Sequence, residues 1–482
     1  MLPFRASLCL PLVISLTTPA APLRAQTPPP GFTYEVVVPA SAGLQNATAM
    51  AFAPDGRLFV TERATGHIRI VRAGVLEPQP WATVPTSSGP SWSEQGLLGI
   101  AIDPDFLQNG YVYVFHADAS GQENYISRLQ DFGGIGVNLT ALTPPGALPS
   151  GPYHNGGTLL FGRDGTLFAA VGDGLGSNNA QDLSQWRGKI LRFEVPNLTV
   201  PANNPLPGSP VWSYGHRNHF GLALHPVTGE VFQTENGGAL MDEINRIVPG
   251  GNYGWPAVEG RETVPNGAYV DPLSWYQPTM APTGCAFYTG SNYPAVWQNG
   301  FFFTDWNQGR IRAVALDATG QNVLAEVIFD DQPGSGYGVT MGPDGNLWYL
   351  GNQNGGYGAN EIGRYVHTNE PLPSLNVQSM SNRGVGGSMT LGVHASPWSI
   401  AGPFMSLNLL PVPLPTPWGN AWILPDASLP AFLVGGDGQG YLAWRVANDP
   451  SLLDLEVHFQ AIHLDATGTL SLTNPKTFTL RG

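Results

Sequence analysis

The stretch "FGRDGTLFAAVGDG" at residues 161–174 contains the pattern that decides the fold. A turn at Asp164 and Gly165 leads into an apolar strand, and a small polar cluster follows that strand. The same order of features recurs five more times. The other copies are "FAPDGRLFVTERATGHIRIV" (52–71), "IDPDFLQNGYVYVFHAD" (102–118), "LHPVTGEVFQTENGG" (224–238), "WQNGFFFTDWNQGRIRAV" (297–314) and "MGPDGNLWYLGNQNGG" (341–356).

The spacing of the six copies predicts a β-propeller. A blade of four strands needs roughly 40–50 residues, or more where its loops carry function. The spacings between copies are 50, 59, 63, 73 and 44 residues, counted from Pro54, Pro104, Arg163, Pro226, Asn299 and Pro343. We therefore expect an all-β protein with a six-bladed propeller over residues 33–366. A β-sandwich with coincidental Asp-Gly turns is the competing interpretation.

The C-terminal part has a different pattern. The segment "HTNEPLPSLNVQSMSNRG" (367–384) contains proline and polar residues, which predicts a linker. Short alternating strands without the repeat follow over residues 385–482, and they predict a separate small β-sandwich. No catalytic pattern lies in this part, so packing, anchoring and carbohydrate contact all remain open roles.

The composition restricts the partners of the protein. Of the 482 residues only 12% are charged, well below the usual ~25%. The formal net charge is −14, which argues against nucleic acid and anionic membranes as partners. The 61 glycines and 45 prolines supply many turns, as an all-β protein with long loops requires.

The N-terminal segment predicts export. Residues 1–25 combine the positive Arg5, an apolar run from Leu8 to Leu16 and the cleavage sequence "LRA" (23–25) before Gln26, which is typical of a cleaved signal peptide. The run is too short to span a bilayer, and no later run is long enough either. We therefore expect a secreted or periplasmic protein without a membrane span. Its mature form would keep Cys285 as the single cysteine, so no internal disulfide is expected.

Five segments, taken in order, identify a family. They are "EQGLLGIAIDPDF" (94–106), "HNGGTLLFGRDGTLFAAVGDG" (154–174), "GKILRFEV" (188–195), "YGHRNHFGLALHPVTGE" (214–230) and "DEINRIVPGGNYGWP" (242–256). In combination they resemble the glucose/sorbosone dehydrogenase family, the soluble quinoprotein aldose sugar dehydrogenases that use pyrroloquinoline quinone (PQQ). The resemblance covers residues 36–366. It implies a six-bladed propeller that oxidises an aldose at its anomeric carbon, with PQQ and calcium.

The resemblance implies that His154 is the general base. An imidazole titrates near neutral pH, as such a base requires, and Gly156 and Gly157 let the backbone approach a ligand closely. The competing interpretation is a histidine that caps a turn. Glu94 lies beside the active site in the family, and either Glu94 or Asp173 is placed to orient His154. For Asp173 we favour a role within its own Gly-Asp-Gly turn.

The resemblance also implies binding residues. Arg217 and Asn218 lie where family members contact cofactor or substrate, although an inter-blade ion pair of Arg217 is equally open. The carbonyl oxygens of Gly237 and Gly238 match those that bind the calcium beside PQQ. Glu243 and Tyr253 match positions of an additional structural calcium, with packing as the competing account for Tyr253.

The pattern departs from the family where PQQ needs cations. PQQ carries three carboxylates, and family members place a lysine in the fifth repeat and an arginine at the start of the sixth. Here Asp305 and Trp306 occupy the first region and Tyr337 the second. Arg310 and Arg312 are candidate substitutes, although strand alternation turns both to one side. Trp306 is suited to stack on a planar cofactor or a sugar ring.

Three functions therefore compete. The first is an exported quinoprotein dehydrogenase that oxidises an aldose with PQQ and calcium and passes electrons to an acceptor that the sequence does not identify. The second is a propeller that binds a sugar or a protein without turnover. The third is a calcium-dependent hydrolase of the lactonase type. The identity of the sugar and the oligomeric state remain open.

Overall fold

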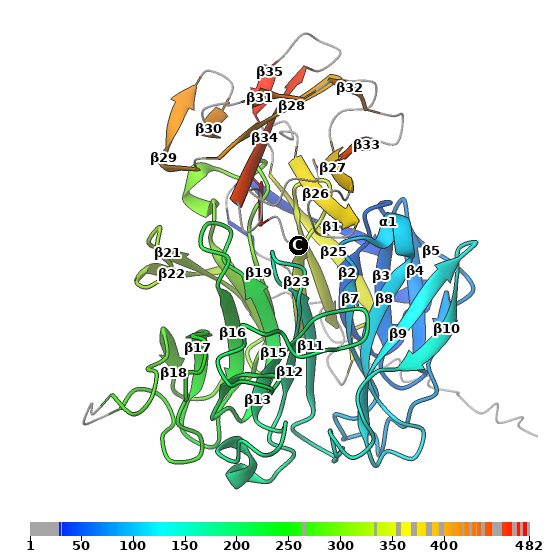
Figure 1. The fold of residues 1–482 in the computed structure, drawn as a ribbon, viewed down its shortest axis with the longest axis vertical. Helices are drawn as coiled ribbons and strands as arrows, with labels where there is room; N and C mark the ends of the chain where they lie inside the picture. The colour runs from blue at the N-terminus through cyan, green and yellow to red at the C-terminus, as the bar shows by residue number, and fades with distance from the viewer. Residues whose placement is uncertain are drawn as a thin grey trace, which may run out of the picture.

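The computed structural model describes residues 28–29, 31–262, 267–331, 335–352 and 358–367, together with separate pieces of 374–479. The expected signal peptide lies outside these residues. Six antiparallel sheets are arranged around a common centre, and Figure 1 shows the labels of their innermost strands, β2, β7, β11, β15, β19 and β23, gathered there. The inner strands of neighbouring sheets contact one another around the whole ring, including β23 with β2. The six-bladed β-propeller is thus confirmed.

Five blades follow the chain order from the centre outward. The first contains β2 (Ala47–Phe52), β3 (Leu58–Glu62), β4 (His67–Arg72) and β5 (Val75–Leu76), with β6 (Ala82–Thr83) beside β4. The second contains β7 (Leu97–Ile102), β8 (Tyr111–Ala117), β9 (Asn124–Phe132) and β10 (Ile135–Ala141). The third contains β11 (Gly156–Phe161), β12 (Leu167–Val171), β13 (Lys189–Phe193) and β14 (Val211–Tyr214). The fourth contains β15 (Asn218–Leu224), β16 (Val231–Asn236), β17 (Asp242–Arg246) and β18 (Ser274–Tyr276). The fifth contains β19 (Pro282–Phe287), β20 (Phe301–Asp305), β21 (Ile311–Leu316) and β22 (Val323–Asp330).

The last blade closes the ring with a strand from the N-terminal side. It contains β23 (Ser335–Met341), β24 (Leu347–Asn352) and β25 (Glu361–His367), and β1 (Phe32–Val38) pairs antiparallel with β25 as the outermost strand. Phe32 of β1 packs edge-on against Tyr293 and Phe329, so aromatic contacts fix this closure as well as hydrogen bonds. The ring therefore depends on both ends of the propeller segment.

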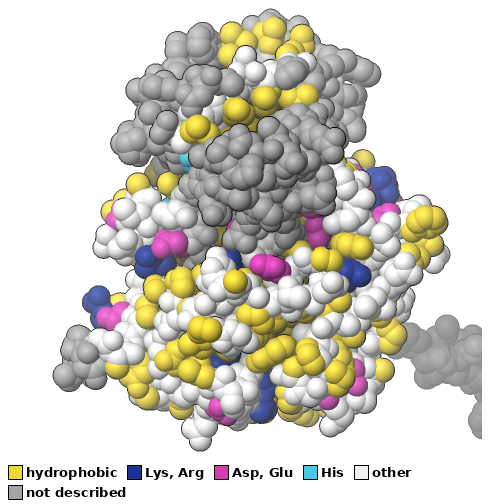
Figure 2. Space-filling view, in the orientation of Figure 1, with side chains coloured by type: hydrophobic (Ala, Val, Ile, Leu, Met, Phe, Trp, Pro, Cys, Tyr) yellow, Lys and Arg dark blue, Asp and Glu magenta, His cyan; other side chains and the backbone are white. Residues whose placement is uncertain are grey.

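The core lies between the blades. Side chains of a strand point alternately to its two faces, so each blade packs against both of its neighbours. In β20, Phe301 and Phe303 join a buried cluster with Phe232 of the fourth blade, whereas Phe302 joins a cluster with Tyr349 of the sixth. The visible face of the molecule carries mostly uncharged side chains, with small separate groups of acidic and basic ones (Figure 2), which agrees with the low charge content.

The C-terminal strands form three further sheets, which lie at one end of the molecule in Figure 1. One contains β26 (Ser374–Ser381), β27 (Ser388–His394) and β33 (Gln439–Arg445). The second contains β28 (Ile400–Ser406), β31 (Ala427–Ser428), β32 (Phe432–Leu433), β34 (Glu456–Leu464), β35 (Leu470–Leu472) and β36 (Lys476–Thr479). The third pairs β29 (Leu409–Thr416) with β30 (Gly419–Ile423). Strand β26 lies inside the expected linker 367–384, so that prediction is wrong at these residues, because they pair along their length with β27. A sandwich arrangement of these sheets stays a prediction.

Helices contribute little to the described part of the chain. The α-helix α1 (Phe106–Asn109) is a single turn, and short 3-10 segments occur at Ala40–Ala42, Ser177–Ala180 and Ala295–Trp297. Among the described residues no helix combines the length and the apolar character that a membrane crossing requires.

Candidate functional site

A cavity of about 840 Å³ runs along the centre of the propeller. All six inner strands line it, through residues such as Met50, Ile100, Leu159, Leu222, Cys285 and Val339. Its polar lining comes mostly from the loops that precede the inner strands or follow the second strands. Eight residues expected at the site line this one cavity: Glu94, His154, Arg217, Asn218, Gly237, Gly238, Trp306 and Tyr337. The other two expected residues, Glu243 and Tyr253, do not line it.

His154 is held with one ring nitrogen committed and the other available. It lies just before β11 with φ at 58°, in the left-handed region that few residues other than glycine adopt. Its Nδ1 lies 2.6 Å from Oδ1 of Asp173. Since a carboxylate only accepts hydrogen bonds, Nδ1 carries the hydrogen, and the lone pair of the neutral ring is on Nε2. Nε2 has no hydrogen-bond partner among the described residues, so His154 is arranged as a base.

Asp173 orients His154, which corrects the preference for a role in its own turn alone. Oδ1 of Asp173 does accept the turn hydrogen bond from Leu175 N–H (2.9 Å) in addition to the one from His154. Oδ2 accepts a hydrogen bond from Nε1 of Trp255 (2.9 Å). The two residues meet because β11 and β12 are paired, so the residue before β11 lies beside the residue after β12.

Glu94 positions the backbone of the base rather than its ring. Its Oε2 accepts hydrogen bonds from His154 N–H (2.7 Å) and from Nδ2 of Asn218 (3.1 Å). Burial raises the pKa of Glu94 above its usual value, and the nearby charge of His154 opposes this shift. Glu94 thus joins three neighbouring blades at the cavity mouth.

Arg217 places a cation at the same mouth. Its Nη1 donates to the carbonyl of Asn236 (3.1 Å), and its guanidinium lies 5.5 Å from the ring centroid of Trp255. Its backbone N–H donates to Oε1 of Glu235 (2.5 Å). No ion pair joins Arg217 to a carboxylate of the described residues, so the inter-blade ion pair is not observed. The remaining donors of the guanidinium are available to a ligand.

Gly237 and Gly238 offer two carbonyl oxygens beside Arg217. Their N–H groups donate to Oδ1 of Asp242 (3.0 Å) and Oε2 of Glu259 (3.0 Å), whereas no described N–H or side chain donates to their carbonyls. A Cβ at Gly237 would lie 1.6 Å from the carbonyl oxygen of Met241, so only glycine fits there. Calcium prefers hard oxygens of this kind. These residues therefore fit a calcium ion at the cavity.

The second expected calcium position is occupied by hydrogen bonds within the protein. Glu243 accepts hydrogen bonds from Gly260 N–H (2.5 Å) and Asn245 Nδ2 (3.1 Å). Burial and the neighbouring Glu235 raise the pKa of Glu243 to about 8. The hydroxyl of Tyr253 donates to Arg246 O, and its ring stacks on His216. These contacts favour the packing account of Tyr253 and do not support a side-chain calcium site.

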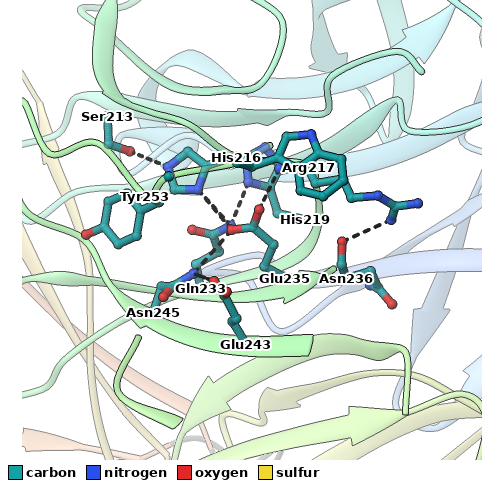
Figure 3. A network of polar contacts seen from close by, with 12 residues as sticks. Ser213, His216, Arg217, His219, Gln233, Glu235, Asn236, Glu243, Asn245 and Tyr253 are labelled. Atoms are coloured by element: carbon teal, nitrogen blue, oxygen red, sulfur yellow. Dashed lines mark hydrogen bonds and ion pairs between the residues drawn. The ribbon is translucent and has the colours of Figure 1, made fainter. Parts of the chain in front are cut away.

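A buried network behind the mouth was not predicted from the sequence (Figure 3). Oε2 of Glu235 accepts hydrogen bonds from His216 Nδ1 (2.9 Å), Gln233 Nε2 (2.8 Å) and Asn245 Nδ2 (3.2 Å). His216, His219 and Glu235 bring ligand atoms within 4.8 Å of one another, as a metal site would. The amide nitrogen of Gln233 bonds both Glu235 and His219 (2.7 Å), however, so a hydrogen-bonded amide already links these groups. Burial acts to raise the pKa of Glu235, but the charges of His216 and His219 and the hydrogen bonds from His216 and the Arg217 backbone together outweigh it, and the pKa is lowered.

The buried network should make the free energy of unfolding fall at acid pH. Burial and the charge of His216 lower the pKa of His219 from 6.5 to about 4. The unfolded chain therefore binds a proton that the folded chain excludes, and this share of the stability is present above pH 6.5 and lost as the pH falls toward 4. Between pH 7 and pH 4 the free energy of unfolding should fall in both proteins. We expect this fall to be about 3 kcal/mol smaller in the His219→Asn variant than in the parent. Urea unfolding at both pH values measures this difference, and parallel pH profiles of the two proteins would contradict it.

The cavity fits PQQ poorly, although it fits calcium. The cations among its described lining are Arg63 and Arg217, and Nη1 of Arg63 is bonded to the carbonyls of Ser93 and Gln95. At the positions where the family has cations, Trp306 Nε1 donates to the hydroxyl of Tyr337 (3.3 Å). PQQ, with its three carboxylates, would thus meet one available guanidinium, that of Arg217. The described residues therefore do not provide the charge that the full PQQ molecule requires.

The candidate substitutes lie elsewhere. Arg310 pairs with Asp331, and Arg312 pairs with Glu326 and with the buried Asp305. Neither arginine lines the cavity. These ion pairs hold both guanidinium groups outside the cavity, so neither arginine replaces the missing cations.

Known proteins are similar to this chain in sequence and in fold. The family model for glucose/sorbosone dehydrogenases matches residues 44–359. The uncharacterised protein slr1608 of Synechocystis sp. is 35% identical over 352 residues, which is 66% of this chain and 84% of that protein. The aldose sugar dehydrogenase YliI of Escherichia coli is 27% identical over 340 residues, covering 65% of this chain and 89% of that protein.

Solved structures of family members are similar to this chain as well. The PQQ-bound aldose sugar dehydrogenase from Streptomyces coelicolor is 30% identical, with a TM-score of 0.59, and covers 70% of this chain and 99% of that one. A putative glucose dehydrogenase from Thermus thermophilus is 34% identical, with a TM-score of 0.60, and covers 70% of this chain and all of that one. The matched region is the propeller that carries His154, Arg217 and the two glycines. The chain therefore belongs to the glucose/sorbosone dehydrogenase family.

Proposed function

We propose that this protein is a sugar oxidoreductase that oxidises an aldose at its anomeric carbon, with His154 as the base. The observation that carries the proposal is the His154–Asp173 pair, whose free Nε2 lies at a cavity that also presents Arg217 and two unpaired glycine carbonyls. The N-terminal segment 1–25 supports a secreted or periplasmic location as part of the same proposal.

The residues of the chain provide for the proton that the oxidation releases. Nε2 of His154 accepts the proton of the anomeric hydroxyl, and the carboxylate of Asp173 stabilises the imidazolium that forms. Glu94 holds the backbone of His154 in place by accepting a hydrogen bond from its N–H. The lost C1 hydrogen leaves as hydride, and a lactone is the product.

A redox partner must accept that hydride. In relatives this chemistry is supplied by a quinone, and the structure of a PQQ-bound relative makes PQQ with calcium the first candidate. Here the carbonyls of Gly237 and Gly238 would hold the calcium, and Arg217 and Asn218 would contact the quinone. The shortage of cations for the PQQ carboxylates predicts weak binding.

The test is reduction of a redox dye by purified protein with calcium, PQQ and a panel of aldoses. We expect sugar-dependent dye reduction that requires both additions and rises with PQQ concentration well above the amount of protein. Absence of dye reduction with every aldose at saturating PQQ would refute the proposal. Acid release from a lactone without any acceptor would instead favour the lactonase alternative.

A propeller that binds sugar without turnover is the second candidate, and the pairing of Trp306 with Tyr337 favours it.

If these two residues replace the missing cations, a single cation placed at one of the two positions should restore affinity for PQQ. We expect the Trp306→Lys variant to bind PQQ at least about 10-fold more tightly in the presence of calcium, because a lysine–carboxylate attraction at the mouth is worth more than about 1.4 kcal/mol.

Equilibrium dialysis of PQQ measures this change. The Trp275→Lys variant, on the exposed side of β18, adds the same charge away from the cavity and serves as the control. Equal PQQ affinity of the parent and the Trp306→Lys variant would show that charge at this position does not limit binding.

A further inference from the structure

An aromatic pair lies at the edge of the cavity, next to the base. The ring centroids of Trp92 and Tyr153 are 5.5 Å apart, and the two planes are inclined by 32°. Both residues line the cavity, yet Trp92 is 46% exposed. Tyr153 directly precedes His154 in the chain. Ligand pockets are lined predominantly by apolar and aromatic side chains, so a half-exposed ring pair at the mouth of the cavity is placed to contact a ligand.

The loops that carry the two rings are fastened to each other. Oγ of Ser93 and the N–H of Glu94 both donate to the carbonyl of Pro152, at 3.1 and 2.7 Å. The return bond runs from His154 N–H to Glu94 Oε2. The neighbours of each ring are therefore tied to the same unit that positions the base.

The buried guanidinium of Arg63 anchors the loop that carries Trp92. Nη1 of Arg63 donates to the carbonyl oxygens of Ser93 (2.6 Å) and Gln95 (2.9 Å), and the side chain of Gln95 donates to Gly121 O (2.7 Å). These hydrogen bonds fix the backbone on both sides of Glu94, close to Trp92. A rigid, pre-arranged ring loses little entropy when a ligand stacks on it.

We propose that Trp92 and Tyr153 form a subsite for the second pyranose ring of an oligosaccharide whose reducing end reaches His154. Pyranose rings carry an apolar C–H face and a rim of hydroxyls, which suits two rings whose Nε1 and hydroxyl have no partner among the described residues. The rings bring no charge, so the subsite selects a neutral sugar. This inference rests on the proposed function for the position of the reducing end. The subsite itself is tested by binding alone.

The test compares cellobiose with glucose by titration calorimetry on the full chain. We expect the parent to bind cellobiose about 10-fold more tightly than glucose, as a stacking contact of ordinary strength would give. The Trp92→Ala variant should lose this preference while its glucose affinity changes less than about 2-fold. Trp275→Ala removes a ring of similar exposure (42%) outside the cavity and should keep the preference.

The outcomes separate the subsite from the reaction. Equal affinity for the two sugars, no binding of either, or a cellobiose preference that survives in Trp92→Ala would overturn the subsite. Cellobiose binding that depends on Trp92 without any dye reduction would uphold the subsite and refute the dehydrogenase. Since Trp92 is half exposed, the variant should keep the parent's thermal transition, and Trp92→Phe, which retains a ring, should keep most of the preference.

Discussion

Replacing His154 with asparagine is expected to lower aldose turnover about 10³-fold, because the variant lacks the base that accepts the anomeric proton. Asparagine is the appropriate replacement, since it tolerates the left-handed backbone at φ 58°, whereas alanine would add strain. Folding should therefore be preserved. Dye reduction at saturating sugar, measured beside a thermal melt, checks both halves of the expectation.

The Asp173→Asn variant is the companion experiment. It keeps the size of the side chain but removes the charge that faces Nδ1 of His154 at 2.6 Å. We expect turnover to fall about 10²-fold or more, with KM changed much less, because the orientation of the base and the charge beside it are lost rather than sugar contacts.

A His154→Asn variant that unfolds, or one that keeps parental turnover, would show that His154 is a structural residue.

Replacing Glu235 with alanine is expected to lower the free energy of unfolding by about 3–5 kcal/mol. Glu235 is 4% exposed, and its carboxylate accepts hydrogen bonds from His216, Gln233, Asn245 and the backbone of Arg217. Its removal leaves all four donors in a buried space without their acceptor. Urea unfolding followed by tryptophan fluorescence measures the loss.

A neighbouring glutamate supplies the control. Glu230, just before the same strand, pairs with Arg246 at 2.8 Å, where the side chain of Glu230 is 32% exposed and that of Arg246 is 26% exposed. Surface pairs of this kind contribute about 0–1 kcal/mol, so Glu230→Ala should change stability little. Equal losses for the two alanine variants would contradict the view that the buried network supports the mouth of the cavity.

The repeats predicted the blades because turn chemistry is local. Each Asp-Gly or Pro-Asp turn lies within a few residues of the strands it joins, as Asp164 and Gly165 do between β11 and β12. Closure of the ring by β1 was visible only as a boundary near residue 33, since its partner β25 is more than 300 residues away. The linker prediction failed at β26 for a related reason, because the pairing that makes it a strand comes from β27.

The site was predictable where a motif carried it. His154, Arg217 and the glycines were placed by family motifs, and the cavity brings them together. The role of Asp173 was misjudged because a Gly-Asp-Gly turn and a bond to His154 are compatible, and the sequence does not reveal that both occur. The Glu235 network and the Trp92–Tyr153 pair join residues from separate strands or loops, and no local signal marks such contacts.

Oxidation of an aldose at this cavity is tested with glucose carrying deuterium at C1, together with the protein, calcium, PQQ and a redox dye. We expect one sugar to be converted to its lactone or aldonate for every two electrons that reach the dye, with the deuterium removed from C1. We also expect the reaction to stop in the His154→Asn variant. Recovery of unchanged deuterated glucose with no dye reduced, at PQQ and sugar concentrations where both are bound, would contradict the claim that this mouth oxidises an aldose.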